Sequence, residues 1–390
     1  VSSCSPTRTS LLTGRYPHNT GAPELHMKEA PFLAALPQFP HELRQSGYYT
    51  AQAGKWHFNG DATKSFESIL KPDSSSGAKY WIQSLKDRPT RKPFFMWFAS
   101  KDAHRGWDQD IADGPHQPTD AIVPPYQYEG SVTRKDYAHY YNEIHRFDKN
   151  IGRVIEELKA QGVYENTIII VMADNGRPFP RDKTWLYDSG IKTPLIIHAP
   201  EILKAPGKVT GLVSIIDLPT TILQRAGVDI PKSFQGKSMI PMLNNPKAKI
   251  CEMVFAERNW HVQRYHERMI RKGNFVYIKN NIPEYAAYSV KKSSRGAFSE
   301  LIDQYKKRNL DQYQKRIFLK PRPAEELFDI TKDPFQLNNL ANNPDYYHII
   351  KKKKNDLDQW SRETGDTVPE KDNLTPDRID RNSWKCLEDE

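Results

Sequence analysis

The stretch Lys92-Pro-Phe-Phe-Met-Trp-Phe-Ala99 is a short apolar run bounded by polar residues, which is typical of a buried strand. A second run of this kind extends from Thr167 to Ala173. Between them, from Asp136 to Gln161, apolar residues recur every three to four positions and form one helical face, which Gly162 is placed to end. The order strand, helix, strand predicts a crossover unit of an α/β fold.

The same alternation continues outward from this unit. Pro194 to His198 and Val213 to Ile216 have the composition of further strands, and Leu218 to Arg225 that of a short helix. Repeated alternation predicts a mostly parallel sheet sandwiched by helices.

The alternation fades near residue 250. Beyond it, Phe275 to Ile278 is predicted to be a strand of a smaller antiparallel sheet. We therefore predict two units, a main α/β domain over residues 1–250 and an α+β subdomain over residues 251–390.

The composition excludes several classes of protein. The 390 residues carry a formal net charge of +9 and 37% hydrophobic residues, which excludes a disordered or fibrous chain. Three cysteines cannot form a disulfide framework, and no apolar run approaches the roughly 20 residues that span a bilayer. Basic residues are not interleaved with stacking aromatics, so nucleic acid is not a predicted partner. The run Lys351 to Lys354 is predicted to lie on a solvated helix face.

The segment Cys4-Ser-Pro-Thr-Arg-Thr-Ser-Leu-Leu-Thr-Gly-Arg15 predicts a helix with a reactive side chain at its amino terminus. Pro6 suits the first helical turn, and Gly14 suits a left-handed stop. Free amides and the helix dipole stabilise an anion beside Cys4, and Arg8 lies about one turn further on. These residues predict an anion site, with a buried structural cysteine as the alternative.

The sequence Cys-Ser-Pro-Thr-Arg, followed by Leu-Thr-Gly-Arg, resembles the motif of the formylglycine-dependent (type I) sulfatases. In that family a maturating enzyme oxidises the cysteine to formylglycine. Thr7 stands where the family most often has serine. The resemblance implies an alkaline-phosphatase-like fold and a sulfuric ester hydrolase.

Further elements of the family pattern follow in order. Gly54-Lys-Trp-His57 resembles the family's Gly-Lys-x-His element, which implies that Lys55 and His57 belong to the site. His104 and Lys183 match the positions of its second active-site histidine and lysine. Taken alone, such a tetrapeptide or a histidine after a strand is an ordinary surface feature. Their order and position relative to the cysteine motif favour a functional role.

Asp174-Asn175-Gly176 resembles the family's calcium-binding element, although the same tripeptide is also an ordinary turn. It follows the predicted strand ending at Ala173, and open parallel sheets bind ligands at the carboxyl ends of their strands. The resemblance implies that Asp174, Asn175 and the formylglycine from Cys4 are calcium ligands.

The acidic pair that supplies two further calcium ligands in this family, at the end of an earlier strand, does not occur here. The sequence begins three residues before Cys4. We therefore expect a fragment of a longer protein, with a sheet that lacks a central strand and a weakly held calcium ion.

The resemblance also implies a mechanism. One hydroxyl of the formylglycine hydrate attacks sulfur, and the other later drives elimination. Calcium with Arg8, Lys55 and Lys183 would hold the sulfuryl oxygens. His104 is the candidate acid for the leaving group, and His57 is the candidate base for the hydrate proton.

The segment Asp174-Asn-Gly-Arg-Pro-Phe-Pro180 resembles the branch of the family that contains heparan N-sulfatase and its bacterial polysaccharide-sulfatase relatives. The predicted substrate is a sulfated oligo- or polysaccharide, such as a glycosaminoglycan, with an O-sulfate or an N-sulfate. The C-terminal subdomain is expected to complete its pocket. The candidate substrate-binding residues are Arg105, Arg258, His261 and His266, with surface charges on an edge strand as the alternative.

Two other functions remain open at this point. One is a phosphodiester or phosphonate monoester hydrolase of the same superfamily. The other is a non-catalytic glycan-binding relative in which Cys4 remains a thiol. A sulfatase of this kind is expected to be exported to the periplasm, the cell surface or the medium, or to the lysosome in a eukaryote. No signal peptide is visible in the sequence.

Overall fold

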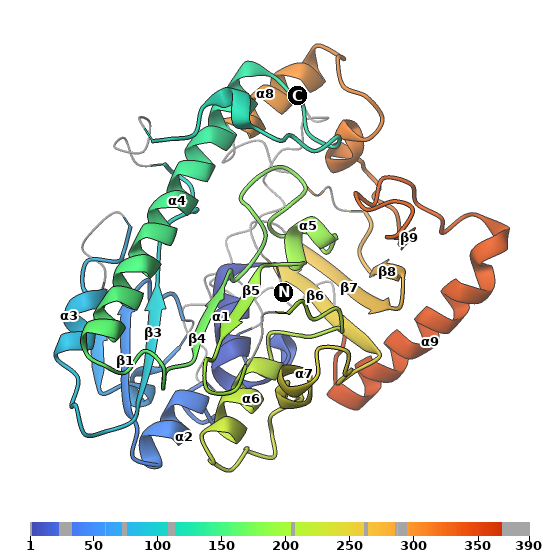
Figure 1. Cartoon of the computed structure of the whole chain (residues 1–390). Coiled ribbons are helices and arrows are strands. Elements are labelled where there is room, and N and C mark those ends of the chain that lie inside the picture. Colours follow the sequence, from blue (N-terminus) through green and yellow to red (C-terminus); the bar gives the residue numbers. More distant parts are fainter. Residues whose placement is uncertain are drawn as a thin grey trace.

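The computed structural model describes residues 2–22, 33–58, 60–71, 76–107, 114–203, 207–260, 264–284, 287 and 295–368. Figure 1 shows an α/β region with its helices and, beside it, a curved antiparallel sheet backed by a long helix. The predicted combination of a parallel sheet with a C-terminal antiparallel sheet is therefore confirmed.

The first sheet is parallel and has three strands in the order β2-β1-β3. These are β1 (Tyr49–Gly54), β2 (Ser68–Leu70) and β3 (Phe94–Ala99). The residue pairs run from Tyr49 with Phe94 to Gly54 with Ala99. The carboxyl ends of β1 and β3 therefore meet at one edge of the sheet.

The second sheet has two strands, β4 (Ile169–Met172) and β5 (Leu195–His198), and they are antiparallel. Strand β5 is thus an exception to the mostly parallel pairing that the alternation predicts. The only described helix between these strands is α5 (Asp188–Ile191), a single turn. A parallel return requires a longer crossover, usually a helix that runs the length of the sheet.

The predicted strand from Val213 to Ile216 does not form. The Ser214 amide donates to the Asp217 carboxylate at 2.7 Å, and helix α6 (Asp217–Arg225) begins at that aspartate. The segment from Val213 to Ile216 therefore leads directly into α6, and a side chain of that helix binds one of its amides.

The long helix α4 (Ser131–Ala160) confirms the helix predicted from Asp136 to Gln161 but begins earlier. The Glu300 carboxylate of helix α8 (Ala297–Lys306) accepts a hydrogen bond from the Thr133 amide at 2.7 Å. A carboxylate that binds the free amides of a first turn stabilises it, and this one comes from a distant part of the chain.

The helices of the α/β region lie on both sides of its strands. Helix α3 contacts α4 and β1, whereas α2 contacts β1 and α6, and α1 contacts α2 and α6. The remaining helices of this region are α1 (Cys4–Thr13), α2 (Phe39–Gln45), α3 (Trp81–Lys86) and α7 (Ile240–Asn244). Short 3-10 helices cover Pro17–Asn19, Thr63–Ser65, Pro118–Asp120, Gln314–Phe318 and Pro344–Tyr346.

A hollow of about 820 Å³ separates the two sheets. Its walls are β3 and β4, together with apolar side chains of α4 and of helices α2 and α6. Among the described residues, the outer edges of β3 and β4 pair with no strand. All four residues of the apolar strand β4 are only half-buried. Within the described residues, the strands of the α/β region therefore form two separate sheets.

The C-terminal sheet is antiparallel in the order β6-β7-β8-β9. Its strands are β6 (Met253–Trp260), β7 (Arg264–Lys272), β8 (Phe275–Asn280) and β9 (Glu325–Asp329). Helix α9 (Tyr347–Thr364) covers one face through Ile350, Leu357 and Trp360. Leu186 and Tyr187, from the loop after β4, pack on the other face. The sheet therefore supports a loop that belongs to the α/β region.

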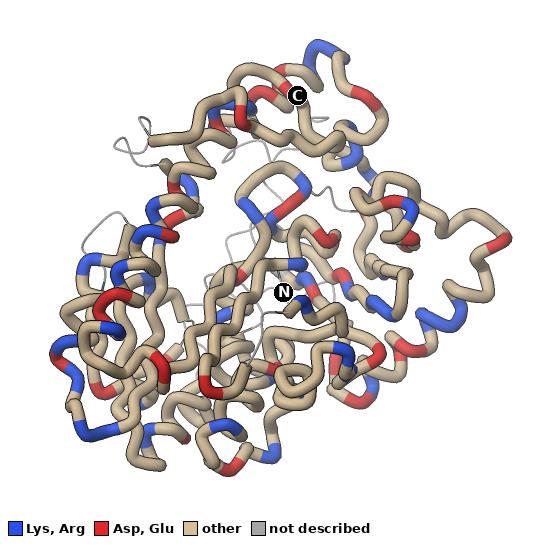
Figure 2. The backbone as a smooth tube through the Cα atoms, viewed as in Figure 1, with Lys and Arg blue, Asp and Glu red and all other residues tan. Residues whose placement is uncertain are grey.

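Along the backbone, Lys and Arg residues are interspersed with Asp and Glu residues (Figure 2). The run Lys351 to Lys354 lies in α9, and Lys351 and Lys352 are exposed as predicted. Lys353, however, is buried, and its ammonium donates to the Lys272 carbonyl at 2.7 Å. The prediction of a fully solvated face was wrong at this position, because one residue in four of a helix turns toward the sheet. Within the described ranges, no helix has the length and apolarity needed to cross a membrane.

Candidate active site

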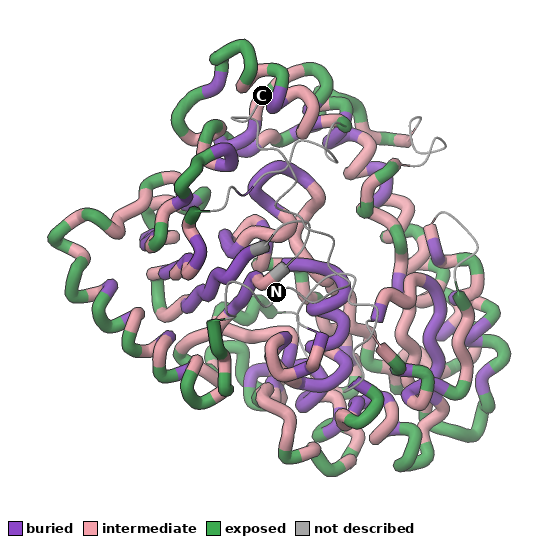
Figure 3. The backbone as a smooth tube through the Cα atoms, turned by 180° about the vertical axis from the view of Figure 1, so that it is seen from behind, coloured by how far each residue is buried: buried purple, intermediate pink, exposed green. Residues whose placement is uncertain are grey.

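Cys4 is the first residue of α1, as predicted, and it is 2% exposed. Buried segments gather around these N-terminal residues at the centre of the molecule (Figure 3). The helix ends at Gly14, which has a φ of +63°. A Cβ atom at Gly14 would lie 2.5 Å from the Phe234 ring, so a glycine is required there on both grounds.

Three side chains converge on the Cys4 sulfur. The ammonium groups of Lys183 and Lys55 lie 3.1 Å and 3.4 Å from Sγ, and the thiol donates to Asn175 Oδ1 at 3.4 Å. Lys55 directly follows β1, and Asn175 follows β4. Burial opposes the charge of Lys183, but Cys4 and Asp174 outweigh it and raise the pKa of this lysine. The site therefore keeps a positive charge next to the sulfur.

Arg8 connects α1 to the segment after β1. Its guanidinium donates to the carbonyl oxygens of Lys55 at 2.6 Å and Trp56 at 3.1 Å, and it lies 3.9 Å from the Asp174 carboxylate. Phe58 also lies under it at 5.3 Å. Arg8 thus fixes the backbone that carries Lys55, in addition to bringing a charge to the site.

Asp174 and Asn175 carry oxygen atoms of the kind that calcium binds. Burial raises the pKa of Asp174, but Lys55, Arg8 and Lys183 together lower it below its ordinary value, so the carboxylate is ionised. A carboxylate and an amide oxygen are suitable calcium ligands, but calcium takes six to eight oxygens. In the described ranges, no group of three or more His, Cys, Asp or Glu side chains could hold a metal. A calcium ion at Asp174 and Asn175 would therefore need further oxygen ligands.

His57 and His104 lie in the field of the same cations. Burial, followed by the charge of Lys55, lowers the pKa of His57 to about 4. His104 is exposed, but partial loss of solvent around its ring, followed by the charges of Lys183 and Lys55, lowers its pKa to about 4 as well. Both imidazoles are therefore neutral at pH 7 in the free site. Neutral His57 can accept a proton, whereas His104 must gain one before it can donate.

A buried network that the sequence did not reveal orders the Lys183 loop. The Asp182 carboxylate is fully buried and accepts hydrogen bonds from Tyr126 at 2.7 Å, Gln127 at 3.0 Å and Arg177 at 2.5 Å. Its position directly before Lys183 was the only sequence signal. Tyr126 and Gln127 come from a proline-rich segment far from the loop in sequence.

The predicted substrate-binding residues have other partners in the structure. Arg105 forms a bidentate ion pair with Asp136 and donates to the Pro178 carbonyl at 2.7 Å. Arg258 is 4% exposed and pairs with Glu267. The other two predicted residues differ, since His266 is buried and bonded to Asn281 at 2.8 Å, and His261 lies outside the described residues.

The fold and the site together define a hydrolase of an anionic ester. A nucleophile position at a helix terminus, two ammonium groups and a carboxylate that can bind a cation suit an ester whose transferred group is an oxyanion. The Sulfatase family model matches residues 1–228, more than half of the chain. The chain belongs to the sulfatase family and is a sulfuric ester hydrolase.

Known proteins resemble the chain over most of its length. An ulvan-active sulfatase of Formosa agariphila is 28% identical, with 93% of this chain and 67% of the relative covered. The N-sulphoglucosamine sulphohydrolase of Homo sapiens is 27% identical, with 94% and 82% covered. A solved structure in complex with D-glucosamine-2-N,6-O-disulfate superposes with a TM-score of 0.68 at 18% identity, over 95% of this chain and 90% of the other. This last likeness supports the fold.

Proposed function

We propose that the chain removes sulfate from a sulfated carbohydrate through a formylglycine formed at Cys4. The observation that carries this proposal is the convergence of Lys55, Lys183 and Asn175 on the Cys4 sulfur, each within 3.4 Å. Two cations next to a nucleophile position suit a sulfuryl group, whose oxygens carry the negative charge.

The relatives support a sulfated sugar as the substrate. One is named for ulvan, another for N-sulphoglucosamine, and the solved complex holds a glucosamine with both an N-sulfate and an O-sulfate. The matched relatives are named as sulfatases, so they do not favour the phosphodiester or phosphonate alternative. We propose an O-sulfated or N-sulfated glycan of the glycosaminoglycan type.

Two groups from outside the amino-acid sequence complete the proposed site. Asp174 and Asn175 would hold calcium, which supplies a positive charge for the sulfuryl oxygens. The formylglycine aldehyde supplies a hydrate hydroxyl as the nucleophile.

The chain's own residues then have distinct tasks. Lys55 and Lys183 bind sulfuryl oxygens and keep the Cys4 position in a positive field. Neutral His57 takes up the proton released at the Cys4 position. The negative charge of the bound sulfate raises the pKa of His104, which allows this residue to protonate the leaving oxygen or nitrogen.

We further propose that a formylglycine-generating enzyme is a partner and that the protein is exported. Oxidation of the cysteine is a reaction on the chain, and it requires an enzyme to carry it out. Sulfated polysaccharides lie outside cells or in lysosomes, so an enzyme acting on them must reach those compartments.

Coexpression with a formylglycine-generating enzyme tests the proposal. Peptide mass analysis should show an aldehyde at Cys4, and the protein should release sulfate from N-sulfoglucosamine, 6-O-sulfated glucosamine or sulfated ulvan fragments. Cys4→Ala should abolish the release. An unconverted Cys4 without activity would favour a glycan-binding role, and faster hydrolysis of a matched phosphodiester would contradict the sulfatase assignment.

A further inference from the structure

Thr184, which directly follows Lys183, has an unusual backbone conformation. Its φ is +78°, in the left-handed region. A β-branched residue is strongly disfavoured there, and such a conformation persists only where the surrounding structure imposes it. Contacts around Thr184 must therefore hold the backbone that carries a catalytic lysine.

Two contacts fix Thr184 from opposite directions. Its amide donates to the carbonyl of Ser2 at 2.8 Å, close to the start of α1 and Cys4. Its hydroxyl oxygen accepts a hydrogen bond from Arg258 Nη2 at 3.3 Å. Arg258 lies on β6 of the C-terminal sheet, so this second contact joins that sheet to the catalytic loop.

Several contacts restrict the conformation of the Arg258 side chain. It lies directly opposite Glu267 on the neighbouring strand β7, and its Nη1 is 3.3 Å from both carboxylate oxygens. The guanidinium is stacked over the Tyr265 ring at 3.4 Å and lies 4.7 Å from the Trp185 ring. Stacking and ion pairing together restrict the guanidinium to one orientation.

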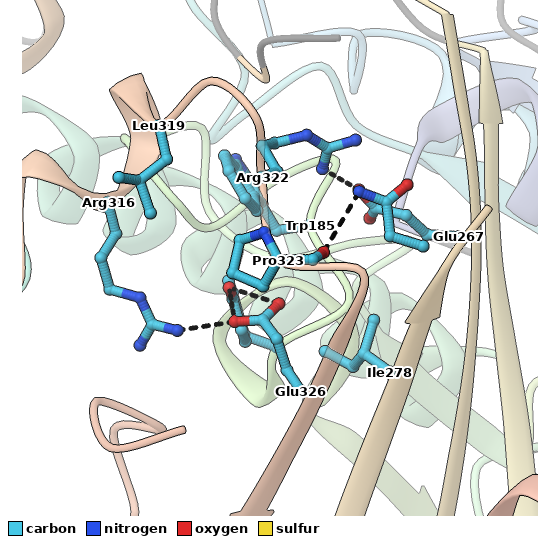
Figure 4. A pocket seen from close by; sticks show the side chains of 10 residues that line it. Trp185, Glu267, Ile278, Arg316, Leu319, Arg322, Pro323 and Glu326 are labelled. Atoms are coloured by element: carbon cyan, nitrogen blue, oxygen red, sulfur yellow. Dashed lines mark hydrogen bonds and ion pairs between the residues drawn. The ribbon is translucent and has the colours of Figure 1, made fainter. Parts of the chain in front are cut away.

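Glu267 remains neutralised without Arg258. Its carboxylate also pairs with Arg322, and Figure 4 shows these two side chains beside Trp185 at a small buried cavity. Burial opposes the charge of Glu267, but Arg322 and Arg258 lower the pKa of this carboxyl below its ordinary value. Loss of Arg258 alone therefore leaves no unpaired buried charge at Glu267.

We propose that Arg258 is a positioning residue that holds Thr184 in its left-handed conformation and thereby directs Lys183 at Cys4. This assignment replaces the predicted contact of Arg258 with substrate. It rests on the proposed role of Lys183 in binding the sulfuryl group. The C-terminal sheet thus contributes to the reaction through a side chain that does not touch the sugar.

The test combines Arg258→Met with Thr184→Gly. Methionine retains apolar volume between the two rings but cannot donate to Thr184. Arg258→Met should lower kcat on the order of 100-fold, as a small displacement of a catalytic group does, and should raise KM only as far as the sulfate group contributes to substrate binding. Glycine adopts a positive φ without support. Thr184→Gly in the Arg258→Met background should therefore recover most of the lost kcat.

Arg268→Met is the matched control. Arg268 is a buried arginine of the same hairpin, paired with Asp366 instead of the catalytic loop. Thr184→Gly should not restore this variant. A raised KM for Arg258→Met without rescue by Thr184→Gly would overturn the proposal in favour of substrate binding. Equal rescue of both arginine variants would also overturn it, because the effect would then be general stabilisation.

Binding of inorganic sulfate separates this inference from the proposed function. Titration calorimetry on the unconverted protein measures the cation cluster without turnover. Arg258→Met should weaken sulfate binding, and added Thr184→Gly should restore it, even if no sulfated sugar is hydrolysed. Unchanged sulfate affinity in Arg258→Met would contradict the positioning role.

Discussion

The two histidines of the site share one protonation state in the free protein, because burial and the same cations lower both pKa values. Each pKa is about 4, so at neutral pH each ring lacks the second proton. A neutral imidazole can accept a proton directly and so act as a base. To act as an acid it must first gain a proton, which the negative charge of the bound sulfate favours. The motif gives only residue types, whereas the protonation state follows first from burial and then from the charges of Lys55 and Lys183.

His104→Gln tests the acid role at the residue scale. An unactivated sugar sulfate needs a proton on its leaving oxygen, whereas an activated aryl sulfate does not. The substitution should lower kcat by about 10²- to 10⁴-fold for the sugar sulfate and far less for the aryl sulfate. Steady-state kinetics on both substrates measure the difference, and equal losses would argue against an acid.

If His57 is the base, the pH profile should decline only at low pH. Protonation of the ring removes the base as the pH falls through its pKa, which is about 4. The value of kcat/KM for an activated aryl sulfate should therefore stay level from pH 7 to about 5 and decline below that range. His57→Gln should lower kcat/KM and remove this limb. A limb near 6.5, the ordinary histidine value, would contradict the assignment.

At the scale of elements, α9 shows that a charged run need not lie in solvent throughout. Burial, followed by the nearby charge of Lys272, lowers the pKa of Lys353 to about 8. The unfolded chain, with an ordinary lysine pKa of about 10.4, binds more protons between these two values. Stability rises with pH wherever the unfolded state binds more protons.

Lys353→Met should therefore change how stability depends on pH. Between about pH 8 and 10, the free energy of unfolding of the native sequence should increase relative to that of Lys353→Met. Denaturant titrations at several pH values measure this difference. The exposed residue Lys351 provides the control, since Lys351→Met should show the same pH slope as the native sequence.

At the scale of the whole molecule, the hollow between β3 and β4 leaves apolar strands half-covered. Apolar surface in contact with water is costly, and a patch of this kind takes up apolar molecules. The neutral dye Nile red should therefore bind the native protein with increased fluorescence.

Ile151→Lys should weaken that dye binding, because Ile151 of α4 lines the hollow. Ile196→Lys is the control, since Ile196 is 60% exposed on β5 and does not line the hollow. Fluorescence titration distinguishes the two variants. Equal dye binding by both would place the dye elsewhere on the protein.

Local patterns predicted strands β3, β4, β5 and β8, the long helix α4 and the helix that begins at Cys4, because each depends on neighbours in the sequence. They missed the antiparallel β5, the helix lead-in at Ser214 and the capping of α4 by Glu300. These features depend on the length of a connection or on a side chain far along the chain. No periodicity in a single segment reports such contacts.

The sequence by itself carried the motifs from which the chemistry is predicted, since Cys4, Lys55, Asp174 and Lys183 stand in motifs of specific type and order. Only the tertiary structure decided how they act. It keeps both histidines neutral by burying them near cations, and it directs Arg258, a predicted sugar contact, at the Thr184 hydroxyl. Protonation and side-chain direction depend on which distant groups share a buried space.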